Sequence, residues 1–121
     1  MTENNFPRSI EALRDELRQF VDERDWAQFH SPKNLSMALS AEAAEVLEHF
    51  LWDSSEETWD LPNEKTEAVA EELADVLIYL VRLADTLDVD LLQAATKKLQ
   101  KNRERYPADK VRGRAVKYDE I

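Results

Sequence analysis

Two segments of this chain each combine an apolar stripe at helical spacing with a pair of acidic residues, and this feature constrains the fold most. In residues 35–52 and again in residues 71–87, apolar side chains recur every three or four positions, which is typical of an amphipathic helix. The first segment carries Glu42 and Glu45 at the margin of its stripe, and the second carries Glu72 and Asp75. Residues three positions apart share a helix face, so each helix is expected to present two carboxylates together.

The stretch between them, residues 53–65, predicts a connection between two antiparallel helices, because it is rich in loop-forming residues and contains a proline. Glu45 lies seven residues before Trp52, the expected end of the first helix, and Glu72 lies six residues after Thr66, the expected start of the second. At a rise of about 1.5 Å per residue, both pairs lie roughly 10 Å from the connection. The four carboxylates are therefore expected to meet.

Four carboxylates that converge beside an apolar core would repel one another unless a cation neutralised them. Oxygen ligands favour a hard ion, so we predict that Glu42, Glu45, Glu72 and Asp75 bind Mg²⁺, with Mn²⁺ as the alternative. The chain contains 26 acidic residues, so similar pairs also arise by chance, and most charged helix positions are simply solvated. The matched height of the two pairs and their place at the edge of the apolar stripes favour the metal site.

The length of 121 residues predicts a single domain, residues 1–121, large enough for a modest core without disulfides. The absence of cysteine excludes a disulfide framework and a thiol nucleophile. The sequence contains neither the apolar core of a signal peptide nor an apolar run long enough to span a bilayer, so we expect a cytoplasmic protein with no membrane partner. A net charge of −10 argues against a nucleic-acid-binding surface.

Basic residues are concentrated in residues 97–117, which contain nine lysines and arginines against two acidic residues. On the helix expected there, Lys98, Asn102 and Arg105 recur at i, i+4 and i+7 and form one polar face suited to phosphate oxygens. The chain has one glycine, Gly113, which excludes glycine-rich phosphate loops, so side chains and metal would have to hold any phosphate. A basic helix that merely balances its acidic neighbours is the alternative.

Two further helices are expected from their caps and breakers. Ser9 is the predicted N-cap of a first helix that ends near residue 24 or 25. Asp90 is the predicted N-cap of a later helix that Pro107 terminates. The tail after Pro107 is too polar for its structure to be predicted.

Aromatic and hydrogen-bonding side chains cluster between the first two helices, around a Ser31-Pro32 turn that is expected to open the second helix. They are Trp26, Phe29, His30 and Asn34. Such groups can hold a planar base by stacking and edge contacts, whereas the alternative makes the aromatic rings core anchors and the histidine a capping residue. Tyr79 lies one turn beyond Asp75, so its hydroxyl is expected near the carboxylates.

Together these motifs resemble the MazG-like all-α nucleoside triphosphate pyrophosphatases, and among them the dCTP pyrophosphatases most. The resemblance covers residues 10–118 and is carried by the stretches ERDWAQFHSPKNL, EAAEVLEHFLW, EELADVLIYLV and KLQKNRERYP. The family signature is E-x-x-E followed by E-x-x-D, and the two acidic pairs match it with 26 residues between them.

The resemblance implies an all-α, four-helix bundle-like fold with an antiparallel metal-binding helix hairpin, assembled as an oligomer that is commonly a tetramer formed from two dimers. It implies hydrolysis between the α and β phosphates of a nucleotide, in the sanitation of the nucleotide pool. The four acidic residues match the family's Mg²⁺ ligands. Its phosphate or sugar contacts are matched by Lys98, Asn102 and Arg105. Its pocket for deoxyribose and cytosine is matched by Trp26, His30, Asn34, Trp52 and Tyr79.

The catalytic residues expected from this chemistry are Glu45, Glu71 and Lys98. Either Glu45 or the adjacent Glu71 would orient the attacking water as general base, and the sequence leaves that choice open. Lys98 would stabilise the transition state.

One position departs from the family pattern, because eukaryotic dCTP pyrophosphatases carry a histidine in the first helix where this chain has Leu17. The base preference therefore stays open, with dUTP or a damaged purine triphosphate as alternatives to dCTP or its modified forms. A non-catalytic helical oligomer that binds nucleotide or protein is the rival from another class. A di-iron bundle is disfavoured because the chain lacks Glu-x-x-His motifs.

Overall fold

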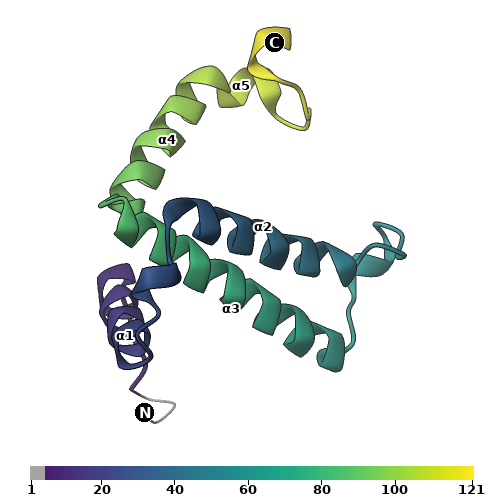
Figure 1. Cartoon of the computed structure of the whole chain (residues 1–121). Coiled ribbons are helices and arrows are strands. Elements are labelled where there is room, and N and C mark those ends of the chain that lie inside the picture. Colours follow the sequence, from purple (N-terminus) through teal and green to yellow (C-terminus); the bar gives the residue numbers. More distant parts are fainter. Residues whose placement is uncertain (1–4) are drawn as a thin grey trace. The chain divides into compact units, whose positions relative to one another are not determined.

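The computed structural model describes residues 5–121, and the regular structure within them is entirely helical (Figure 1). The α-helices are α1 (Ile10–Glu23), α2 (Pro32–Glu48), α3 (Asn63–Thr86), α4 (Leu91–Arg105) and α5 (Ala108–Val111). Short 3₁₀ helices are η1 (Ala27–Phe29), η2 (Glu57–Trp59) and η3 (Tyr118–Glu120). The expectation of an all-α chain is confirmed.

The N-caps predicted at Ser9 and Asp90 are confirmed, and Ser31, in the turn expected to open the second helix, is the N-cap of α2. The Ser9 hydroxyl accepts a hydrogen bond from the Ala12 amide at 3.0 Å, and the Ser31 hydroxyl accepts one from the Asn34 amide at 3.1 Å. The Asp90 carboxylate accepts one from the Gln93 amide at 3.0 Å. Each bond satisfies an amide that has no partner inside its helix, which is why Ser and Asp are favoured at this position.

The contacts of the chain divide it into two compact units, one ending at Val89 and the other comprising Asp90–Ile121, and each is described by itself. In the first unit α2 and α3 lie side by side and run in opposite directions, and α1 packs on α3 (Figure 1). The buried apolar residues come from all three helices: Val21, Leu35, Val69, Val81 and Ala84. That α1–α3 core fixes the surface on which the candidate site is built, while the single domain of residues 1–121 stays a prediction.

The boundaries predicted for the connection between α2 and α3 are wrong at both ends. The first helix ends at Glu48 rather than near Trp52, because the amides of His49 and Phe50 bond to carbonyls three residues back and tighten the chain into turns. The second begins at Asn63, three residues earlier than expected, directly after Pro62 with its extended backbone (ψ 149°). The connection is thus residues 49–62.

The second unit contains α4, α5 and the C-terminal tail. No structure was predicted for the residues after Pro107. Tyr118 of η3 packs edge-to-face on Tyr106 with ring centroids 6.3 Å apart, and the Arg105 guanidinium lies 4.8 Å from the centre of the Tyr118 ring. Gly113 has a φ of 73°, a left-handed conformation that lets the chain turn between α5 and η3. In residues 5–121 no helix is both long and apolar enough to cross a membrane.

Candidate functional site

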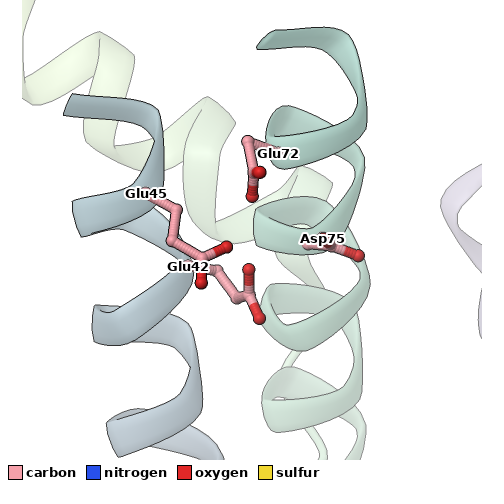
Figure 2. Close-up of side chains that lie close together, drawn as sticks. All are labelled: Glu42, Glu45, Glu72 and Asp75. Carbon is pink, nitrogen blue, oxygen red and sulfur yellow. The ribbon is translucent and has the colours of Figure 1, made fainter. Parts of the chain in front are cut away.

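The two acidic pairs come together between α2 and α3 (Figure 2). Glu42 and Glu45 extend from α2, and Glu72 and Asp75 belong to the facing turns of α3. One carboxylate oxygen of each residue lies within 4.8 Å of those of the other three. The predicted convergence of the four carboxylates is confirmed, and we call them the acidic cluster.

The carboxylates of the acidic cluster change one another's protonation. A hydrogen bond with Glu45 raises the pKa of Glu42 to about 7, and burial and the neighbouring negative charges act in the same direction. The pKa of Glu72 is raised as well, first by its hydrogen bond with Glu45 and then by burial. The pKa of Glu45 is lowered, because Glu72 and Glu42 both stabilise its ionised form. Without a cation, Glu42 therefore retains its proton up to about pH 7.

Two atoms of the acidic cluster lack any partner within the described part of the chain. Oε2 of Glu42 and Oε2 of Glu72 are inaccessible to solvent and accept no hydrogen bond. Leaving such a buried polar atom unsatisfied is unfavourable by about 1–3 kcal/mol. A set of oxygen donors with free lone pairs fits a hard divalent cation.

A pocket of about 490 Å³ lies beside the acidic cluster in the first unit. Asp75 belongs to both, since it also lines this pocket. Three of the residues predicted to bind substrate line it too, namely Trp26, His30 and Tyr79. Leu17 of α1 contributes an apolar wall at the position where the family resemblance leads one to expect a histidine.

Two other predicted pocket residues have different surroundings. The Asn34 side chain donates a hydrogen bond to the Phe29 carbonyl at 3.0 Å, so it braces the turn before α2. Trp52 lies in the connection with 91% of its surface exposed, and it is not among the residues that line the pocket.

The remaining predicted residues lie outside the acidic cluster. Glu71 is exposed on α3, next to Glu72. Lys98, Asn102 and Arg105 belong to α4 in the second unit, where Lys98 is exposed and the other two are half-buried. Their shared helix face agrees with the predicted spacing, and their contact with phosphate stays a prediction.

A second cluster of charged groups adjoins the pocket, and it was not predicted from the sequence. Arg18 of α1 donates two hydrogen bonds to Asp85 of α3, at 2.6 and 2.8 Å. Arg82 donates to Asp85 at 3.3 Å through Nη1 and to Nδ1 of His30 at 3.1 Å through Nε. We call these four residues the arginine network.

The arginine network also shifts the pKa values of its members. Hydrogen bonding from Arg18 lowers the pKa of Asp85, and burial lowers the pKa of His30, with the charge of Arg82 acting in the same direction. One sequence signal could have indicated Arg82, because Asp75, Tyr79 and Arg82 follow one another at spacings of four and three on a single face of α3. The partners on α1 and before α2 could not be read from that spacing.

Comparisons with known proteins agree on one family. Residues 37–121 match the MazG-like family. The chain is 45% identical over 117 residues to dCTP pyrophosphatase 1 of Mus musculus and 44% identical over 117 residues to that of Homo sapiens, and each match covers 93% of this chain and 68% of the relative. The crystal structure of a pyrophosphatase from Archaeoglobus fulgidus superposes with a TM-score of 0.77 at 41% identity, covering 85% of this chain and 96% of that one.

Proposed function

Because this chain belongs to the MazG-like family and is a nucleotide pyrophosphohydrolase, we propose that it hydrolyses dCTP or a modified dCTP to the monophosphate and pyrophosphate, with Mg²⁺ as cofactor. In this reaction water attacks the α-phosphorus and pyrophosphate leaves. The observation that carries the proposal is the double position of Asp75, in the acidic cluster and on the pocket wall. One ligand could therefore keep its phosphates at the cluster and its base in the pocket.

The acidic cluster would hold the Mg²⁺, with Mn²⁺ as a second candidate. Its unpartnered Glu42 and Glu72 oxygens support this assignment, because a hard cation would satisfy both. When bound, the ion would neutralise charge on the triphosphate and polarise the α-phosphoryl group. The protein's own contribution is to hold the carboxylates together on two packed helices before substrate arrives.

The pocket would hold the base and the deoxyribose. Trp26 packs edge-to-face on Phe20 with ring centroids 5.7 Å apart, which steadies an indole that is still 43% exposed and available for stacking. His30 and Tyr79 add hydrogen-bonding groups on the same wall. Asn34 would act through the turn that carries His30.

Lys98, Asn102 and Arg105 are proposed to contact phosphate or sugar oxygens. Lys98→Ala should then lower kcat/KM by about a hundredfold, the usual effect of removing one donor that faces developing charge. Substitution of the neighbouring Lys97 by Ala is the matched control, since it lies off the predicted face. Unchanged catalytic efficiency in Lys98→Ala would remove this residue from the site.

The general base is proposed to be Glu45 or Glu71. Glu45 has a lowered pKa and stays ionised, but it also belongs to the acidic cluster. Glu71 is exposed and directly precedes Glu72 of the cluster. The two assignments separate when turnover and metal binding are measured together. If Glu71 is the base, Glu71→Gln should lose turnover and keep the metal affinity, and if Glu45 is the base, Glu71→Gln should remain active.

The oligomer implied by the family, a tetramer formed from two dimers, is part of the proposal. Trp52 and Trp59 in the connection are 91% and 89% exposed, and such large apolar side chains favour contact with another copy. In an oligomer Trp52 would be available to a neighbouring pocket. We further propose a cytoplasmic role in nucleotide-pool sanitation.

The second candidate is the same reaction on another nucleotide, such as dUTP or a damaged purine triphosphate. The observation that favours it is Leu17, whose apolar side chain lines the pocket and offers no hydrogen bond to a base edge. A pocket that relies on stacking discriminates poorly between bases.

The deciding experiment measures pyrophosphate release from each common nucleoside and deoxynucleoside triphosphate, with and without Mg²⁺. We expect metal-dependent release that is fastest with dCTP and lost in Glu42→Gln. Faster release from dUTP would transfer the proposal to the second candidate. Full activity in Glu42→Gln, or activity that persists after chelation, would contradict the assigned metal site.

A further inference from the structure

We propose that Arg82 is a positioning residue, which fixes His30 as a neutral imidazole whose Nε2–H donates a hydrogen bond to the base in the pocket. The inference rests on the proposed function, and it specifies the hydrogen-bonding character of the base that the pocket prefers. The pocket would prefer a pyrimidine with an unprotonated ring nitrogen, as in cytosine, over one with a ring N–H, as in uracil.

The tautomer follows from the hydrogen bond between Arg82 and His30. The guanidinium has donors only and stays protonated in proteins. Its Nε lies 3.1 Å from Nδ1 of His30, so Nδ1 must offer a lone pair. A neutral imidazole has one ring proton, which is then on Nε2.

The orientation of Arg82 is itself fixed by two other residues. Its Nη1 donates to Asp85 at 3.3 Å while its Nε donates to His30, so one planar fork spans both acceptors. Asp85 is held in turn by the two bonds from Arg18. The side chains of Arg82 and Asp85 are only 13% and 11% exposed, which shields both contacts from competing water.

These contacts tie three elements of the first unit to the pocket. Arg18 belongs to α1, Arg82 and Asp85 belong to α3, and His30 lies just before α2. Arg82 and His30 both line the pocket. The donor state of the imidazole is therefore set by the fold before any ligand binds.

A fixed N–H donor discriminates between pyrimidines. The N3 atom of cytosine is a hydrogen-bond acceptor, whereas N3 of uracil or thymine carries a hydrogen and would face the donor with another donor. Such a mismatch leaves both polar groups without a partner, which discriminates more strongly than a small difference in size. Leu17 of α1, which also lines the pocket, is apolar and adds no competing polar group.

The first test reads the tautomer directly, without nucleotide or metal. The chain has two histidines, His30 and His49, so a long-range proton–nitrogen NMR spectrum of the intact protein labelled with ¹⁵N-histidine has two ring systems, assigned with a His30→Asn variant. At pH 7 we expect His30 in the Nε2–H form, and in Arg82→Met we expect a mixture of tautomers. An Nδ1–H or doubly protonated His30 in the wild type would overturn the proposal, whatever the enzyme's activity.

The second test compares kcat/KM for dCTP with that for dUTP. Arg82→Met should lower the preference for dCTP about tenfold, the effect of one weakened hydrogen bond, mainly by raising KM for dCTP while kcat changes little. Asp85 keeps both bonds from Arg18 in this variant. Arg14→Met, which alters an arginine of α1 paired with its neighbour Asp15, is the matched control and should leave the ratio unchanged.

The two tests distinguish failure of this inference from failure of the proposed function. An unchanged dCTP:dUTP ratio in Arg82→Met overturns the positioning role, even if the enzyme is fully active. No pyrophosphate release by the wild type from any triphosphate overturns the proposed function and the base preference together. The NMR result would then still decide whether Arg82 sets the His30 tautomer.

Discussion

The acidic cluster and the arginine network both include residues of α3, but their charged groups are paired differently. In the acidic cluster four carboxylates face one another and two of their oxygens have no partner among the described residues. In the arginine network Asp85 is bonded to Arg18 and Arg82, and Arg82 is also bonded to His30. The first arrangement would be completed by the proposed cation, whereas the second already pairs its charges within the chain.

The largest effect on turnover should come from substituting Asp75, the carboxylate that belongs to the acidic cluster and also lines the pocket. Asp75→Asn keeps the size of the side chain and removes its charge, so it should lower turnover by more than about a hundredfold, since even residues that only support metal ligands contribute that much. Pyrophosphate release measures this effect, and circular dichroism confirms that the helices persist. An active Asp75→Asn enzyme would contradict the view that the cluster is completed by a cation.

A smaller effect, on stability rather than turnover, is expected from the arginine network. Asp85→Ala removes the acceptor that Arg18 and Arg82 share and should destabilise the fold by about 2–3 kcal/mol, below the 3–5 kcal/mol of a fully buried pair because Arg18 is half-exposed. Denaturant unfolding measures the loss. It should be the same with and without Mg²⁺, because the network needs no cation.

A stability loss that depended on Mg²⁺ would show that the two regions are energetically coupled. If Mg²⁺ restored the stability of Asp85→Ala, the acidic cluster and the network would be coupled through α3. Asp15→Ala is the control for loss of an exposed charge on α1, and its effect should stay within about 0.5 kcal/mol.

The same contrast explains what the sequence could predict. The acidic pairs and the helix caps depend on residues three apart in one helix, and that local spacing placed Glu42 with Glu45, Glu72 with Asp75, and Ser9 at its cap. The arginine network joins α1, α3 and the segment before α2, so it depends on how helices pack. No periodicity within one segment contains that information.

The convergence of the two acidic pairs was predicted correctly from helix ends that were placed incorrectly. Glu45 lies three residues before the end of α2 at Glu48, and Glu72 lies nine residues after the start of α3 at Asn63. The pairs meet because the apolar faces of α2 and α3 determine how the helices align, and the asymmetric connection accommodates the difference. The periodicity of the stripes was thus a better guide than distance from the connection.

The smallest expected effect is the change of folding stability with pH, which has opposite signs for the acidic cluster and the arginine network. The pKa of Glu42 is raised from 4.5 to about 7, so the folded protein binds a proton that the unfolded chain releases. Stability of the metal-free protein should therefore fall as pH rises from about 4.5 to 7. His30 has the opposite sign, since its lowered pKa means that stability is lost as pH falls below 6.5.

Glu42→Gln isolates the contribution of the acidic cluster, because glutamine keeps a donor for Glu45 and does not ionise. Without metal, the variant should match the wild type near pH 5 and become the more stable of the two near pH 8, as measured by denaturant unfolding at each pH. Saturating Mg²⁺ should reverse the order at pH 8, because at about a hundredfold excess over Kd a bound ion stabilises the wild type by about 2.7 kcal/mol. A difference between the two proteins that did not change with pH would mean that Glu42 does not share its proton with Glu45, and the contrast with the self-sufficient arginine network would then rest on the unpartnered oxygens alone.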